Sequence, residues 1–177
     1  MNQLQRYQLL ENWVKNQFPT RPFLLSPASA DASFRRYFRI EFSDKSAPKT
    51  LIVMDAPPEH EDCASFLYVA NIFSAANVHV PEILAKDLSQ GFFLLSDLGS
   101  TTYLESIGGS SSVAGDLYHD AIDALIRIQS ASCTGELPDY DEKLLLKELN
   151  LFPDWYLVKY LKVALDTNQK EELSNCF

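Results

Sequence analysis

The chain has 177 residues, with 46% hydrophobic residues and a formal net charge of −9. This length and composition suffice for one ordinary domain or two small lobes with a buried core. An acidic chain lacks the basic face that a binder of the nucleic-acid backbone needs. The sequence has neither an 18-residue apolar run nor a signal-peptide pattern at its N-terminus, so we expect a cytoplasmic protein without a membrane partner.

The first part of the chain combines helix and strand patterns. Apolar residues recur at helical spacing over 3–17, where the sequence predicts an amphipathic helix. A second helix is predicted over 60–76, because acidic residues stand where a helix N-terminus favours negative charge. Five segments rich in apolar and aromatic residues predict strands, at 23–26, 34–42, 50–56, 82–87 and 91–96.

The second part of the chain carries helical patterns only. A Gly-Ser connector at 108–112 precedes an apolar stripe over 116–131, and Asp141 is a good N-cap for the next helix. Two further helices are predicted over 154–165 and 169–177. The change of pattern indicates an α+β unit at 1–97, built on an antiparallel sheet, and a helical unit at 98–177.

Four segments stand at the turning points of this pattern: ADASFRRYFRI, LIVMDAPPEHEDC, VHVPEIL and FFLLSDLGSTTYL. Together with the helical segment LKELNLFPDWYL, they resemble the N-acetylmuramate/N-acetylglucosamine kinases, a branch of the aminoglycoside-phosphotransferase-like kinases. The resemblance runs from about Leu4 to the end of the chain. It implies a protein-kinase-like small lobe, with a five-stranded antiparallel sheet plus a helix, followed by the first helices of an incomplete helical lobe.

The resemblance also implies an activity and its partners. Such enzymes move the γ-phosphate of ATP, with Mg²⁺, onto the anomeric hydroxyl of an amino sugar in cell-wall recycling. An aminoglycoside or another small hydroxyl compound is the alternative acceptor. A module without catalytic activity, which binds nucleotide or acts through a partner, is the alternative function.

The segment at 26–33 is expected to cover the nucleotide phosphates, as the loop between the first two strands does in kinases. Its small residues let backbone N–H groups approach an anion, and hydroxyls can add donors. Strand alternation places Arg35 and Arg39 on one face and Arg36 on the other, so not all three can serve. The residues alone favour a solvated strand with arginines on its open face. With the resemblance, we expect at least one phosphate-facing arginine, and nucleotide-binding groups among Ser29, Asp31, Ser33, Arg35, Arg36 and Arg39.

The segment LLSDLG is expected to form the hinge between the lobes, where backbone groups bind adenine. Ile52 and Leu95 would wall the ring, and Ser96, Asp97 and Leu98 follow them in the hinge. By the resemblance, Met54 stands where kinases carry a phosphate-binding lysine, and Ser65 or Phe66 where they carry its glutamate partner. We therefore expect Arg39 to take the phosphate role, oriented by Asp55, Glu61 or Asp62.

A kinase catalytic loop contains His-x-Asp with an Asn five residues after the Asp. No Asn in this sequence has an Asp five positions earlier. Asp139 and Asp141 imitate a metal pair, but a helix cap explains Asp141 better. We therefore expect no catalytic and no metal-binding residue in this chain, Mg²⁺ ligands outside it, and no phosphoryl transfer by the chain alone.

Overall fold

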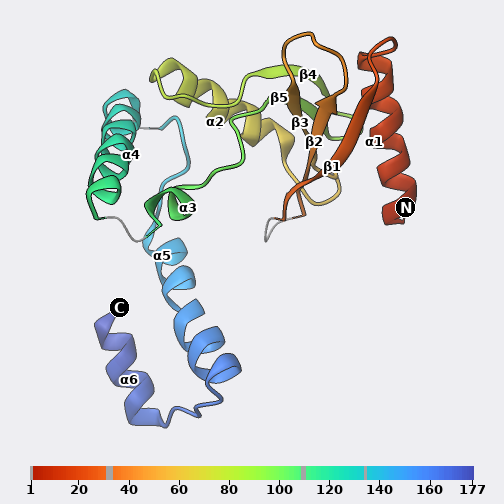
Figure 1. Ribbon diagram of the computed structural model, residues 1–177. Helices are drawn as coiled ribbons and strands as arrows, with labels where there is room; N and C mark the ends of the chain where they lie inside the picture. The colour runs from red at the N-terminus through yellow and green to blue at the C-terminus, as the bar shows by residue number, and fades with distance from the viewer. Residues whose placement is uncertain (1, 31–33, 109–110, 134) are drawn as a thin grey trace. The chain divides into compact units, whose positions relative to one another are not determined.

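The computed structural model describes residues 2–30, 34–108, 111–133 and 135–177 (Figure 1). Its centre is a five-stranded sheet in the order β1-β2-β3-β5-β4, in which every neighbouring pair is antiparallel. This arrangement confirms the predicted sheet of a protein-kinase-like small lobe. The strands are β1 (Phe23–Ala30), β2 (Arg36–Phe42), β3 (Thr50–Asp55), β4 (Ile83–Asp87) and β5 (Phe92–Ser96).

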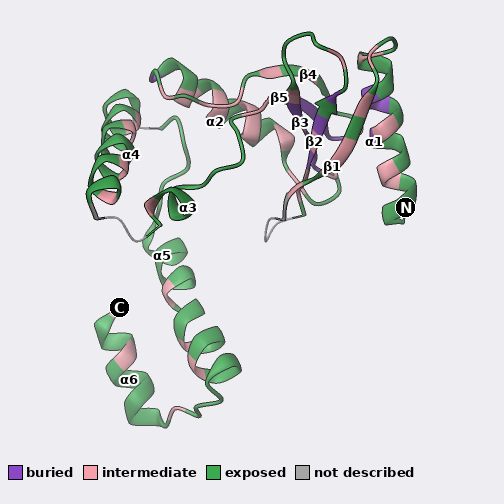
Figure 2. Ribbon diagram, in the orientation of Figure 1, coloured by how far each residue is buried: buried purple, intermediate pink, exposed green. Residues whose placement is uncertain are grey.

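Helix α1 (Gln3–Gln17) covers one face of the sheet, as its apolar stripe predicts. Asn2 caps the helix, and its side-chain oxygen accepts a hydrogen bond of 2.8 Å from the amide of Gln5. Leu10 and Val14 of α1 are fully buried in a cluster with alternate residues of β2, β3 and β5. Figure 2 shows that the buried residues concentrate in the sheet and on the side of α1 that faces it.

Helix α2 (Cys63–Ala75) packs on the opposite face through Phe66 and Leu67. These side chains meet Met54 and Phe93, which alternate along β3 and β5 with the residues that face α1. The helix begins three residues later than predicted, because Asp62 caps it and accepts a hydrogen bond of 3.0 Å from Ala64. The sheet therefore lies between two helices.

Other predicted boundaries also differ from the structure. The strand predicted at 23–26 continues to Ala30, because β1 pairs with β2 along this length, with a register shift between Pro27 and Ser29 that accommodates a bulge. Helix α4 (Ser111–Ala131) starts within the predicted Gly-Ser connector, of which 109–110 lie outside the described residues. The helix predicted over 154–165 is a π-helix, η1 (Phe152–Tyr160).

The remaining described elements are helical. They are α3 (Tyr103–Ile107), α5 (Glu142–Leu149) and α6 (Thr167–Cys176), and Asp141 caps α5 as predicted, accepting a bond of 2.8 Å from Leu144. The chain divides into two compact units, Met1–Ser132 and Cys133–Phe177. The boundary predicted at 97/98 stays a prediction.

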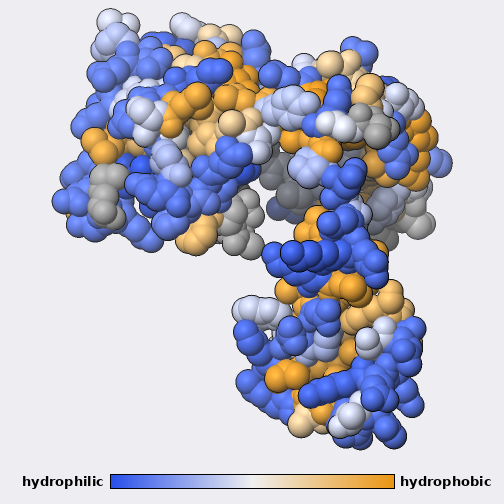
Figure 3. All heavy atoms as spheres, turned by 180° about the vertical axis from the view of Figure 1, so that it is seen from behind, coloured by the Kyte–Doolittle hydropathy of each residue, from blue (hydrophilic) through white to orange (hydrophobic). Residues whose placement is uncertain are grey.

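The unit Cys133–Phe177 has no buried residue among those the structure describes. Large apolar side chains such as Trp155 and Tyr160 are exposed on it, and apolar patches interrupt its hydrophilic surface in Figure 3. This unit therefore does not enclose a core within its described part. Among all the described residues of the chain, none of the helices combines the length and apolar character needed to cross a membrane.

We expect Gly91→Ala to destabilise the fold more than Gly99→Ala. Both glycines have positive φ, at 71° and 98°, which costs another residue about 1–2 kcal/mol. A Cβ on Gly91 would also lie 1.8 Å from the carbonyl oxygen of Ala56, whereas a Cβ on Gly99 meets no described atom within 4 Å. Thermal or urea unfolding of the two variants measures the difference, and equal stability would show that the Gly91 backbone can move aside.

Candidate functional site

A hollow of about 230 Å³ opens on the α2 side of the sheet, where β3 and β5 meet the segment that follows β5. Ile52 is opposite Leu95 in the β3–β5 register and opposite Arg39 in the β2–β3 register, so one row of side chains forms its floor. The structure brings together six predicted site residues here: Arg39, Ile52, Leu95, Ser96, Asp97 and Leu98. Ala28, Tyr37, Pro81 and Gly99 also line the hollow.

Arg39 and Asp97 form a two-pronged ion pair at one wall of this hollow. Nε of Arg39 lies 2.7 Å and Nη2 lies 3.2 Å from the two carboxylate oxygens of Asp97. Nη2 also donates a bond of 3.0 Å to the carbonyl of Gly99, whose amide donates to Asp97 over 2.9 Å. The pair therefore fastens the segment after β5 to β2. The prediction that Asp55, Glu61 or Asp62 orients Arg39 is wrong, because Asp97 does so.

The Arg39–Asp97 pair shifts the ionisation of both partners. The hydrogen bond from Arg39 lowers the pKa of Asp97, and the bond to Asp97 raises the pKa of Arg39. The Asp97 side chain is only 5% exposed, so its charge depends on this partner. Both groups are therefore held in their charged forms at neutral pH.

Ser96 forms two hydrogen bonds with Glu82, in the segment that leads into β4. Its amide donates a bond of 2.9 Å to the carbonyl of Glu82, and its hydroxyl oxygen accepts a bond of 2.8 Å from the Glu82 amide. The backbone N–H of Ser96 is thus used within the sheet. Ser96 and Leu98 were the two backbone partners predicted for adenine. Leu98 lies beyond the last strand, and its side chain is exposed.

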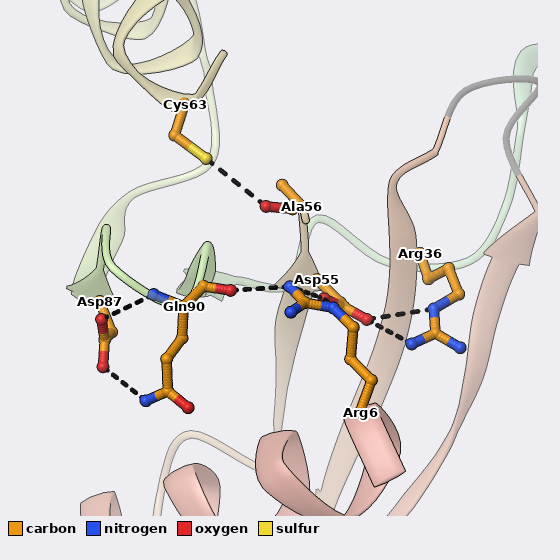
Figure 4. Close-up of polar contacts among 7 residues, drawn as sticks. All are labelled: Arg6, Arg36, Asp55, Ala56, Cys63, Asp87 and Gln90. Atoms are coloured by element: carbon orange, nitrogen blue, oxygen red, sulfur yellow. Dashed lines mark hydrogen bonds and ion pairs between the residues drawn. The ribbon is translucent and has the colours of Figure 1, made fainter. Parts of the chain in front are cut away.

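Arg36 lies on the opposite face, as strand alternation predicts, and binds the buried carboxylate of Asp55 (Figure 4). Its Nε and Nη2 are 3.1 Å and 2.5 Å from one oxygen of Asp55. Arg6 of α1 donates to the other oxygen over 2.7 Å, and also to the carbonyl of Gln90 over 2.7 Å. This cluster joins α1, β2, β3 and the β4–β5 turn, and it holds Arg36 away from the hollow.

Arg35 comes just before β2 and meets the turn that precedes α2. Its Nε donates a bond of 2.8 Å to Glu61, and its guanidinium carbon lies 5.4 Å from the centre of the Phe66 ring. Glu61 also accepts a bond of 3.2 Å from the amide of Phe34. Burial lowers the pKa of Arg35, but Glu61 and then Tyr37 raise it, and the net shift is upward.

The structure places Met54 in the core and Ser29 in a strand. Met54 is fully buried in the core beneath α2. Ser29 belongs to strand β1 rather than to a loop, while Asp31 and Ser33 lie outside the described residues. Residues 26–30 of the predicted phosphate-covering segment are thus part of a strand, because their backbone pairs with β2.

Two residues of these contacts, Tyr37 and Arg6, were not predicted from the sequence. Tyr37 is two residues from both Arg35 and Arg39, so the strand alternation that placed the arginines could also have placed Tyr37. Nothing in the helical pattern of 3–17 marks Arg6 as the partner of a residue 49 positions later. Within the described part of the chain, no group of three or more His, Cys, Asp or Glu side chains is placed to hold a metal ion.

Comparison with known proteins agrees with this geometry. The profile of the phosphotransferase enzyme family matches residues 25–175, and the chain belongs to that family. The chain is 48% identical over 171 residues to an N-acetylmuramate/N-acetylglucosamine kinase of Pseudomonas aeruginosa, covering 91% of this chain and 49% of that protein.

Two more relatives carry the same name. The one from Neisseria meningitidis is 41% identical over 172 residues, covering 95% of this chain and 49% of that protein. The one from Pseudomonas putida is 44% identical over 146 residues, covering 82% and 41%. The chain spans about half the length of the curated relatives that it matches most fully. The family expected from the sequence motifs is confirmed.

We expect Asp97→Asn to lower stability at neutral pH but much less in acid. The lowered pKa of Asp97 means that its contribution is present above the ordinary aspartate pKa of about 3.9 and is lost as the pH falls through the lower folded value. Urea unfolding of the chain and the variant between about pH 7 and pH 2 measures this difference. A difference that stays constant over this range would show that the lost interaction is not the charged pair.

Proposed function

We propose that this chain forms the nucleotide-binding part of an ATP-dependent sugar kinase. The observation that carries the proposal is the hollow of about 230 Å³ beside Ile52, Leu95 and the Asp97–Gly99 segment. Its aliphatic walls suit the faces of a purine ring, and the backbone after β5 supplies polar groups at its edge. A hollow of this size holds a base rather than a whole nucleotide, so the ribose and phosphates extend beyond it.

The amino-sugar acceptor is proposed from the relatives. Three relatives with 41–48% identity are named N-acetylmuramate/N-acetylglucosamine kinase. Transfer of the γ-phosphate to the anomeric hydroxyl of such a sugar, with Mg²⁺, in cytoplasmic cell-wall recycling is the finer part of the proposal. Because the chain spans about half of these relatives, nucleotide binding is a more direct test than turnover.

We expect Ala28→Phe to weaken binding of both ATP and adenosine by about tenfold or more, because the added ring occupies the space proposed for adenine. Leu24→Phe is the matched control, since Leu24 lies on the same strand, is 63% exposed and is not part of the lining. Calorimetric titration of the purified chain and the two variants measures the affinities. A wild-type chain that binds neither compound, or equal binding by all three proteins, would overturn the proposed site.

We expect Arg39→Gln to weaken ATP and adenosine equally, by about tenfold. The contacts of Arg39 with Asp97 and Gly99 give it a role in holding the hinge segment, and a charge-assisted bond is worth about 1.5–3 kcal/mol. The same titrations provide the measurement. A much larger loss for ATP than for adenosine would instead restore Arg39 to the phosphate role that the sequence suggested.

A further inference from the structure

The place where a kinase carries its lysine–glutamate pair is apolar in this chain. That pair links the third strand to the following helix and holds the nucleotide phosphates. Met54 of β3 is fully buried, and Phe66 of α2 packs on Phe93 with ring centres 5.6 Å apart. The fold therefore has a strand-to-helix contact here, but these two residues contribute no charge.

An arginine–glutamate pair from other segments reaches the same place. Arg35 lies over the Phe66 ring, and its Nε is 2.8 Å from an oxygen of Glu61 in the turn before α2. The Glu61 side chain is only 11% exposed, and its second oxygen accepts the Phe34 amide, so the carboxylate is fixed from two sides. The pair connects the residue just before β2 to the turn just before α2.

Arg35 also adjoins the proposed adenine hollow. Tyr37, which interacts with Arg35, lines that hollow and is opposite Met54 in the β2–β3 register. Pro81 lines both that hollow and a neighbouring apolar one to which Arg35 contributes. Tyr37 and Pro81 therefore connect Arg35 to the hollow proposed for the base.

Each of the other two arginines of the same segment binds a different aspartate. Arg36 donates hydrogen bonds from Nε and Nη2 to Asp55 on the α1 face of the sheet. Arg39 donates hydrogen bonds from Nε and Nη2 to Asp97, and Nη2 also donates to the Gly99 carbonyl. Arg35 contacts Glu61 through Nε and interacts with Tyr37, on the α2 face that also carries the hollow.

We propose that Arg35, oriented by Glu61, binds the polyphosphate of the nucleotide, and that this pair takes the place of the kinase lysine–glutamate pair. The inference rests on the proposed function and names the residue that supplies the phosphate contact. A guanidinium has five N–H donors in a planar fork, so it can bind Glu61 on one edge and phosphate oxygens on another. In this scheme Glu61 is a positioning residue, because it acts through Arg35.

The test measures ATP and adenosine affinity of the purified chain by calorimetry in the presence of Mg²⁺. Arg35→Gln is expected to weaken ATP by about ten- to a hundredfold and to leave adenosine within about twofold, because adenosine has no phosphate. Glu61→Gln is expected to give a smaller loss for ATP alone. The double variant should resemble Arg35→Gln rather than the product of the two effects, because both changes act on one contact.

Arg21→Gln is the matched control, because Arg21 makes the same kind of pair away from the hollow. Its Nε lies 2.8 Å from Asp44, and its guanidinium lies over the Phe42 ring. This variant should bind ATP and adenosine as the unchanged chain does. Equal losses of ATP and adenosine in Arg35→Gln, or no loss, would overturn the inference while leaving the nucleotide site in place. An unchanged chain that binds neither compound would overturn both.

Discussion

The buried carboxylate of Asp55 is the interaction on which the arrangement of the small lobe depends. It is the one charged residue that is fully buried in the described structure, and an isolated carboxylate there would cost several kcal/mol. Arg6 and Arg36 compensate that cost from two elements, and Arg6 also holds the carbonyl of Gln90. The charge thus fixes α1, the start of β2 and the β4–β5 turn around the end of β3.

This constraint also decides what the three clustered arginines can do. Since strand alternation turns Arg36 toward Asp55, only Arg35 and Arg39 remain on the face that carries the hollow. Asp97 then holds Arg39 beside the segment after β5, and Glu61 holds Arg35 at the start of α2. Each arginine has its own acid from a different segment, so each guanidinium is held in place by a partner that also balances its charge.

The sequence was sufficient for the sheet, because β3 and β5 are apolar runs and β2 alternates apolar and polar residues. It was insufficient for β1, since the small and polar residues at 26–30 have the composition of a loop, and only pairing with β2 makes them a strand. Ile52, Leu95 and the segment after β5 were predicted as site residues from the order of elements in the kinases that the sequence resembles. Arg39–Asp97 was not, because the two residues are 58 positions apart and meet only through sheet register.

The Arg35–Glu61 pair makes the position of α2 part of the proposed binding step. Glu61 directly precedes Asp62, which caps α2 through the Ala64 amide, so the carboxylate that orients Arg35 is rigidly joined to the helix. A phosphate that approaches Arg35 adds negative charge near Glu61, and the guanidinium stays between the two because it can donate on both edges. Nucleotide binding would therefore strengthen the link between β2 and α2, with Phe66 keeping Arg35 over the helix face. The lysine–glutamate link of kinases joins sheet to helix in the same way, and in the proposed scheme the corresponding link starts from the beginning of β2 instead of from β3.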